Sequence, residues 1–305
     1  MRLAPLLLLL APCALLAKGP APLVDHHQHL LTAAMAAPGQ APIDARSMIA
    51  MLDAAGIRRA VLLSNAFRLD DYGKVIAEND WTAREAAKYP TRLTAFCSFN
   101  PLKDYALTEL TRCVHEKRFG RGIKLQFGFS DVDLDDQVDI ALLRRVFRTA
   151  NANGMAIVVH MRTRSSRTFG ASQALTFLDE LLAAAPDVPV QIAHFCGGGA
   201  PVDEAADQAL AVFTAAIERH DPRVKNLYFD LALVAPAGLS PARAGFVAQH
   251  IRTIGVKHVL YGSDGGDPTD PPPKLQHQAF RKLPLTEVEF SAIENNVAPY
   301  LARPR

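Results

Sequence analysis

Residues 23–29 read Leu23-Val24-Asp25-His26-His27-Gln28-His29, a short apolar start that ends in a group of histidines. Four later stretches share this design, in which an apolar run carries or stops at a polar side chain: Gly122-Ile123-Lys124-Leu125, Ala156-Ile157-Val158-Val159-His160, Val190-Gln191-Ile192-Ala193-His194 and Val259-Leu260-Tyr261-Gly262-Ser263-Asp264. A strand that is apolar on both faces belongs to a parallel sheet covered by helices. In a closed parallel barrel the ends of such strands meet at one rim, so residues as distant in sequence as His29 and Asp264 can share a site.

Eight strand-like runs follow one another along the chain, separated by stretches with helical periodicity. The runs cover residues 23–27, 60–64, 93–99, 122–126, 156–160, 190–194, 226–231 and 257–262. Repeated alternation of strand and helix implies right-handed crossovers and a parallel sheet. No linker or low-complexity segment divides the chain, so we expect one α/β domain, a single (β/α)8 TIM barrel. The Pro-rich residues 267–273 are expected to form a rigid loop over the rim.

The length and charge of the chain limit the classes of partner. The chain has 305 residues, 49% of them hydrophobic, and a formal net charge of +2. This length allows a large core without a disulfide framework. The small charge and the dispersed basic residues give no indication of a nucleic-acid partner. We expect a small-molecule substrate and no membrane span, and the sequence leaves a homo-oligomer open.

Residues 1–17 differ in character from the rest of the chain. Arg2 precedes an apolar run, residues 3–17, which is rich in leucine and ends in small residues. This pattern is typical of a secretory signal peptide, and the run is too short to span a bilayer comfortably. We therefore expect a signal peptide at 1–17, a barrel domain at 18–305, and an exported protein that is periplasmic or secreted. The residues around Cys13 match a lipoprotein acylation box only loosely, so lipid anchoring is the less favoured alternative.

Removal of the leader leaves three cysteines, Cys97, Cys113 and Cys196. Three cysteines cannot all pair internally, and their spacing fits neither a zinc ribbon nor a redox motif. Cys97 falls in an apolar strand and Cys113 on a helix, so we expect buried free thiols. Cys196 comes two residues after His194 and could line the site, although packing is the preferred interpretation.

The histidines at the strand ends indicate a metal site. His27 and His29 are two residues apart, so in a strand both side chains point to the same face. Imidazole suits several divalent transition metals, and a carboxylate such as Asp264 adds a hard oxygen ligand to the site. His160 and His194 would add ligands or catalytic groups from the fifth and sixth strands. The combination of these features, rather than the His-x-His pair alone, predicts the site.

Together these motifs resemble the amidohydrolase superfamily, in its amidohydrolase-related branch of metal-dependent hydrolases, lactonases and aromatic-acid decarboxylases. The resemblance extends over roughly residues 22–302. It is carried by Asp25-x-His27-x-His29, Gly122-Ile123-Lys124-Leu125, Val159-His160, Ala193-His194-Phe195-x-Gly197-Gly198, Leu260-Tyr261-Gly262-Ser263-Asp264 and residues 293–298. The motifs are specific for the superfamily and not for one reaction.

The resemblance implies one catalytic divalent ion, with zinc as the preferred metal, held by His27, His29, His160 and Asp264. It also implies that His194 and Asp264 are the catalytic residues, with His194 acting as a general base or orienting the water. Binuclear relatives carry a carbamylated lysine on the fourth strand. Lys124 lies in a context that resembles the mononuclear branch, where a plain cation at the rim is the preferred interpretation, and the number of ions stays open.

The candidate substrate-binding residues are Lys124, Arg162 and Arg164, because a cationic side chain at the rim can bind a substrate carboxylate. Further candidates are Asn65, Arg68, Trp81 and Asn100. The leading hypothesis is a metal-dependent hydrolase that uses a metal-activated water on a lactone, cyclic amide or amide bond. The alternative is a metal-dependent non-oxidative decarboxylase of an aromatic or unsaturated carboxylic acid. A barrel without activity that serves as a binding module is disfavoured by the intact ligand set.

Overall fold

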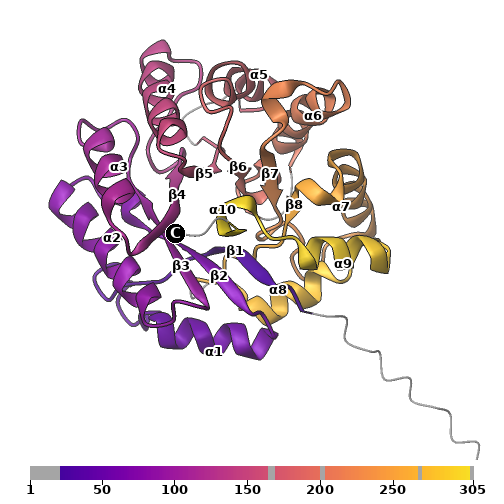
Figure 1. The fold of residues 1–305 in the computed structure, drawn as a ribbon. Helices are drawn as coiled ribbons and strands as arrows, with labels where there is room; N and C mark the ends of the chain where they lie inside the picture. Colours follow the sequence, from indigo (N-terminus) through magenta and orange to yellow (C-terminus); the bar gives the residue numbers. More distant parts are fainter. Residues whose placement is uncertain (1–20, 164–168, 200–202, 267–269, 303–305) are drawn as a thin grey trace, which may run out of the picture.

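Eight parallel strands form one sheet in the order β1 to β8, with helices packed around it (Figure 1). The computed structural model describes residues 21–163, 169–199, 203–266 and 270–302. The strands are β1 (Val24–Gln28), β2 (Arg59–Leu63), β3 (Leu93–Ser98), β4 (Phe119–Gln126), β5 (Ala156–His160), β6 (Val190–Ile192), β7 (Leu227–Asp230) and β8 (Val259–Leu260). Each strand pairs in parallel with the next, which is the order expected of a sequential strand–helix chain.

Two backbone hydrogen bonds bring the last strand back to the first. The amide of His26 donates to the carbonyl of Tyr261 at 2.9 Å, and the amide of Asp264 donates to the carbonyl of His27 at 2.8 Å. The sheet therefore curls into a nearly closed barrel, and the predicted single (β/α)8 fold is confirmed. This closure places the residues after β1 directly beside those after β8.

All helices but the last cover the outside of the barrel with their apolar faces inward, and the last lies over one end of the barrel (Figure 1). They are α1 (Ala45–Ala55), α2 (Tyr72–Ala87), α3 (Ala106–His115), α4 (Gln137–Ala152), α5 (Ala171–Thr176), α6 (Glu204–Glu218), α7 (Pro241–Ile254), α8 (Pro273–Phe280), α9 (Glu287–Asn295) and α10 (Pro299–Ala302). Asp44, Asp71 and Asp136 accept hydrogen bonds from the first turns of α1, α2 and α4, as N-cap residues do. Within the described parts of the chain, none of these helices combines the length and the hydropathy that crossing a bilayer requires.

Four strands are shorter than the sequence predicts, β3 by one residue, β6 and β7 by two and β8 by four. The sixth run was expected to reach residue 194, but β6 ends at Ile192 because His194, Phe195 and Cys196 all have positive φ angles, of 55°, 51° and 63°. β8 keeps only two residues, since the preceding residues form a short 3-10 helix. The expected leader lies outside the described residues, as do residues 267–269 of the Pro-rich loop, so both stay predictions.

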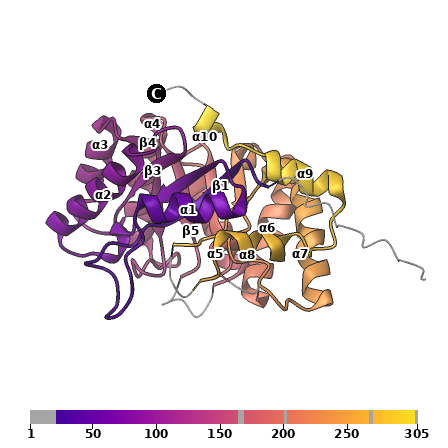
Figure 2. The same cartoon turned by 90° about the horizontal axis from the view of Figure 1, so that it is seen from below.

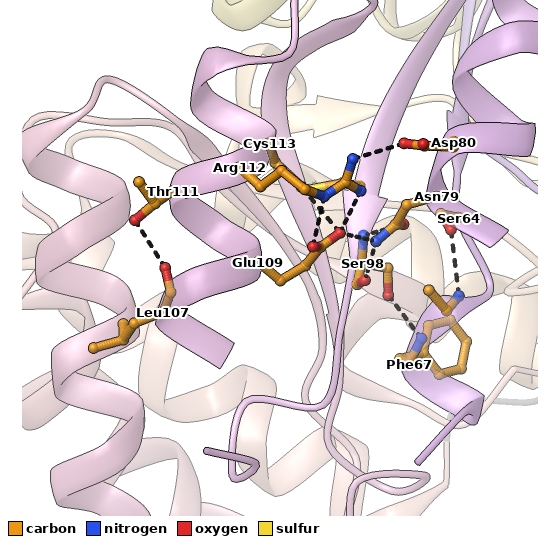
Figure 3. The surroundings of a disulfide bond; sticks show 12 residues. Ser64, Phe67, Asn79, Asp80, Ser98, Leu107, Glu109, Thr111, Arg112 and Cys113 are labelled. Atoms are coloured by element: carbon orange, nitrogen blue, oxygen red, sulfur yellow. Dashed lines mark hydrogen bonds and ion pairs between the residues drawn. A yellow bond between two sulfur atoms is a disulfide. The ribbon is translucent and has the colours of Figure 1, made fainter. Parts of the chain in front are cut away.

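A disulfide joins Cys97 on β3 to Cys113 on α3, and the expectation of free thiols at these two positions was wrong (Figure 3). The helix packs back onto its own strand, which brings two cysteines 16 positions apart to a Cα–Cα distance of 6.4 Å. Next to the bridge, Asn79 donates to Glu109 at 2.7 Å and also to the carbonyl of Ser98 at 2.8 Å (Figure 3). Cys196 is the buried free cysteine.

We expect reduction of this disulfide to lower the free energy of unfolding without changing the site. A closed loop of this length removes about 3 kcal/mol of chain entropy from the unfolded state. Urea unfolding of the Cys97→Ser/Cys113→Ser variant should show a loss of that order relative to the oxidised protein. Titration of thiols in the denatured, unreduced protein is the check on pairing: reaction of both Cys97 and Cys113 would contradict the bridge.

Candidate metal centre

Three imidazoles converge on the carboxylate of Asp264. Its Oδ1 lies 3.6 Å from His27 Nε2 and 3.5 Å from His29 Nε2, and its Oδ2 lies 3.7 Å from His194 Nε2. His27 comes from β1, and the other three residues follow the ends of β1, β6 and β8. The structure therefore brings together four of the residues that the sequence singled out.

Each of these three imidazoles is oriented by an acceptor at its other nitrogen. The Nδ1 of His29 donates to the carbonyl of Leu63 at 2.6 Å, and that of His194 donates to the carbonyl of Ala232 at 2.8 Å. The Nδ1 of His27 donates to the carboxylate of Asp230 at 3.0 Å. A neutral imidazole that donates from Nδ1 keeps a lone pair on Nε2. The Nε2 lone pairs of all three imidazoles, which lie next to Asp264, are thus available to a cation.

Asp230, at the end of β7, is a site residue that the sequence analysis missed. It is fully buried, and besides His27 it accepts hydrogen bonds from the side chain of Gln191 at 2.7 Å and from the backbone amides of His194 at 3.0 Å and Ala232 at 3.1 Å. Burial alone would raise the pKa of Asp230, but His27 and these donors hold it below its usual value. The signal was present, because Asp230 ends an apolar strand just as the other site residues do.

The donor set fits a divalent metal ion. In a tetrahedral site with bonds of about 2.0–2.1 Å, neighbouring ligand atoms lie roughly 3.4 Å apart, close to the distances from Asp264 Oδ1 to His27 and His29. Burial lowers the pKa values of His29 and His194, which favours the neutral imidazoles that a metal requires. Burial would raise the pKa of Asp264, but the imidazoles and Lys124 lower it to about 2, so it is a carboxylate.

His160 stands slightly apart from this group. Among the described residues, the potential ligand atoms that lie within 4.8 Å of one another belong to His27, His29 and Asp264, or to His27, His194 and Asp230. The ring of His160 packs against that of His194, with centroids 4.7 Å apart, and its Nδ1 faces the amide nitrogen of Gln126 at 3.4 Å. His160 thus lines the centre, and its role as a metal ligand stays a prediction.

Gln126 itself has a fixed orientation. Its Oε1 accepts a hydrogen bond from the backbone amide of Phe129 at 2.6 Å, which leaves its amide nitrogen towards His160. In this arrangement the Nδ1 of His160 is an acceptor, and the neutral ring carries its proton on Nε2. Ligation through Nε2 would require the other tautomer.

The backbone is unusual at two of the converging residues. His194 and Asp264 have φ angles of 55° and 57°, in the left-handed region that side chains other than glycine rarely adopt. Such conformations persist where the surroundings hold them, and they concentrate at functional sites. At His194 the turn directs the side chain towards the centre of the rim, where continued strand alternation would have placed it on the same outer face as Val190 and Ile192.

The remaining sequence candidates lie in different surroundings. Lys124 on β4 is buried, with its Nζ 3.3 Å from His27 Nε2, and burial lowers its pKa to about 8.

Arg162 makes a two-pronged ion pair with Asp203 at 2.8 and 2.9 Å, so binding a substrate would require this pair to open. Arg164 lies outside the described residues. His26 has a packing role and points away from the centre, since its two ring nitrogens are hydrogen-bonded to the backbone of Tyr261 and Ala298.

A small cavity of about 130 Å³ lies above these side chains. Its polar floor consists of the histidines, Asp264 and Lys124, and Phe67 and Phe129 form an apolar part of the wall. Asn65 and Arg68 also line it, whereas Trp81 and Asn100 are not among its lining residues. The cavity is of a size for a small molecule whose polar group reaches the floor.

A (β/α)8 barrel with three imidazoles and a carboxylate at its rim defines a class of metal-dependent enzymes. The model of the amidohydrolase family matches residues 24–295, and the chain belongs to this family. Family members are metal-dependent enzymes that include hydrolases and decarboxylases. No curated protein matches the chain.

Solved structures with the same fold carry both kinds of activity in their names. A 5-carboxyvanillate decarboxylase from Sphingomonas paucimobilis is 16% identical with a TM-score of 0.62, covering 90% of this chain and 96% of its own. A probable 2-pyrone-4,6-dicarboxylic acid hydrolase from Acinetobacter baumannii is 16% identical with a TM-score of 0.60, covering 89% and 96%. A 5-carboxyvanillate decarboxylase from Novosphingobium aromaticivorans, complexed with manganese, is 15% identical with a TM-score of 0.59, covering 90% and 94%. At these identities the likeness supports the fold alone.

Proposed function

We propose that the protein is a metal-dependent hydrolase that cleaves a lactone, cyclic amide or amide bond in a small substrate bearing a carboxylate. The observation that carries this proposal is the position of Asp264. One of its oxygens faces the His27–His29 pair and the other faces His194. Such a carboxylate suits a metal-dependent hydrolase, because one group adjoins both the cation site and the proton path.

The fitting ion is a divalent cation, with zinc as the preferred metal, held by His27, His29 and Asp264 and with His160 as a further candidate ligand. Such an ion polarises a substrate carbonyl and lowers the pKa of water towards neutrality. The chain's own residues move the proton. Asp264 takes it from the attacking water, and its second oxygen passes it to His194 Nε2. His194 then protonates the leaving oxygen or nitrogen as the C–O or C–N bond breaks.

Lys124 supports a substrate that carries a carboxylate. Its ammonium group is buried at the cavity floor, and among the described residues it makes no ion pair with a carboxylate. Asp264 and Asp230 stabilise this buried charge only from beyond ion-pair distance, so an anionic substrate group in direct contact would stabilise it further. Lys124 is therefore the proposed anchor, while Arg162, already paired with Asp203, is the weaker candidate.

One observation favours the decarboxylase as a second candidate. Phe67 and Phe129 line the cavity with ring centroids 5.7 Å apart, and the guanidinium of Arg68 lies 4.8 Å from the centre of the Phe129 ring. Aromatic walls of this kind suit a planar conjugated acid. In that reaction the cation would orient the acid, and a protein group would protonate the carbon that loses CO2.

The two candidates are separated by analysis of the reaction products. Elemental analysis of protein purified without chelator should find about one divalent ion per chain. With a panel of lactones, amides and aromatic acids in ¹⁸O-water, we expect one labelled oxygen in the new carboxylate and no CO2. Release of CO2, with no labelled oxygen incorporated into a carboxylate product, would favour the decarboxylase instead. A protein that contains no metal and binds none would contradict both candidates.

A further inference from the structure

Three buried polar side chains connect His27 with the opposite end of the barrel. The hydroxyl of Tyr300 donates to Gln191 Oε1 at 2.6 Å, and Gln191 Nε2 donates to Asp230 Oδ2 at 2.7 Å. The same oxygen of Asp230 accepts from His27 Nδ1 at 3.0 Å. Tyr300 is 6% exposed, and Gln191 and Asp230 are fully buried. A continuous hydrogen-bond chain therefore leads from the C-terminal helix to a predicted metal ligand.

Tyr300 belongs to α10, which lies over one end of the barrel (Figure 1). In the side view α10 is at the end opposite to the loop that follows β1 (Figure 2). The ring packs edge-on against Phe96, with centroids 5.1 Å apart, in an apolar layer that also contains Val61, Val158 and Leu260. For packing in such a layer a phenylalanine would suffice. The hydroxyl is accounted for by its hydrogen bond.

The hydrogen-bond chain can run in only one direction. The carboxylate of Asp230 can only accept, so Gln191 has to present its amide nitrogen to it. The carbonyl oxygen of Gln191 then points the other way and requires a donor, which the hydroxyl of Tyr300 provides. Without this donor, the buried carbonyl oxygen of Gln191 would lack a partner, and the amide would be held only by the hydrogen bonds of its nitrogen to Asp230 and to the carbonyl of His26.

We propose that Tyr300 is a positioning residue for the metal centre. Acting through Gln191 and Asp230, it holds the imidazole of His27 with its proton on Nδ1 and the lone pair of Nε2 towards Asp264. Hydrogen-bond partners of ligating histidines tune metal binding in this way. The proposal rests on the metal site described under the proposed function, and it adds a residue that contacts neither the ion nor the substrate.

The test compares Tyr300→Phe with Tyr105→Phe in a Co2+ titration against a competing chelator. The hydroxyl of Tyr105 donates to the carbonyl of Leu69 at 3.1 Å, so this control loses a tyrosine hydrogen bond that has no connection to His27. Loss of a direct partner of a ligand costs about 10–100-fold in affinity, so we expect Tyr300→Phe to cost about 3–10-fold and Tyr105→Phe nothing. Equal Co2+ affinity of Tyr300→Phe and the wild type would overturn the proposal.

A second readout does not depend on metal. The ¹⁵N shifts of the His27 ring report which nitrogen carries the proton, and we expect less of the Nδ1–H form in Tyr300→Phe and in Gln191→Met, which removes the link at its centre. An unchanged tautomer in both variants would contradict the role of Tyr300. A wild-type protein that binds no Co2+ would contradict the metal site, and the ring shifts would still decide whether Tyr300 positions His27.

Discussion

Asp264→Asn is expected to lower turnover by about 1000-fold or more and to weaken metal binding at the same time. The amide keeps the shape of the carboxylate but loses its charge and its ability to accept the proton. Both losses follow from one position, because Asp264 lies 3.5–3.7 Å from three imidazole nitrogens. Metal content after dialysis and steady-state turnover, measured on the same preparation, check this prediction.

The matched control is Asp104→Asn, which removes the charge of an exposed aspartate before α3. It should leave both quantities unchanged. If Asp264→Asn kept full metal content and lost only turnover, Asp264 would be a proton carrier that does not ligate. Retention of both metal and turnover would exclude it from the site.

His194→Asn is expected to keep the metal and lower turnover by about 100-fold. His194 faces the second oxygen of Asp264, so it can carry the proton without being needed to hold the ion. Asparagine is a suitable replacement, because it tolerates the left-handed backbone of this position better than most residues do. Turnover at saturating substrate and metal content check the two halves of the prediction.

His220→Asn provides a close control for the backbone. His220 has the same φ of 55° but is exposed and lies on the surface after α6. This variant should match the wild type in activity. Complete release of metal from His194→Asn would show instead that His194 is a ligand, and a site with a different ligand set would become the better description.

The convergence of His27, His29, His194 and Asp264 could be predicted because it depends on strand order, which the apolar runs reveal. Sequential parallel strands place all their ends at one rim whatever the details of packing. The turns after β6 and β8 could not be predicted in the same way. Their left-handed residues are not glycines, and the surrounding structure holds them in place.

Two other features were not predicted, for different reasons. The bond between Cys97 and Cys113 depends on how α3 packs against β3, and spacing alone does not give a pairing. Asp230 was missed although Leu227 to Phe229 is an apolar run that ends in a carboxylate. The rule that found Asp264 would have found Asp230 had it been applied to every strand.

The junction between β8 and β1, where the barrel closes, is a short seam, and a bound cation would have a structural role there as well as a chemical one. Among the described residues two backbone hydrogen bonds cross it, and Asp25 and Gln28 add side-chain hydrogen bonds to Ser263 and Gly265. His27 and His29 lie on one side of it and Asp264 on the other. An ion held by these residues fastens the beginning of the barrel to its end. Without it, the seam would depend on these hydrogen bonds alone, and any opening would expose two unpaired strand edges, which readily pair with other molecules and start aggregation. The supply of metal during synthesis would then govern the yield of soluble protein as well as its activity.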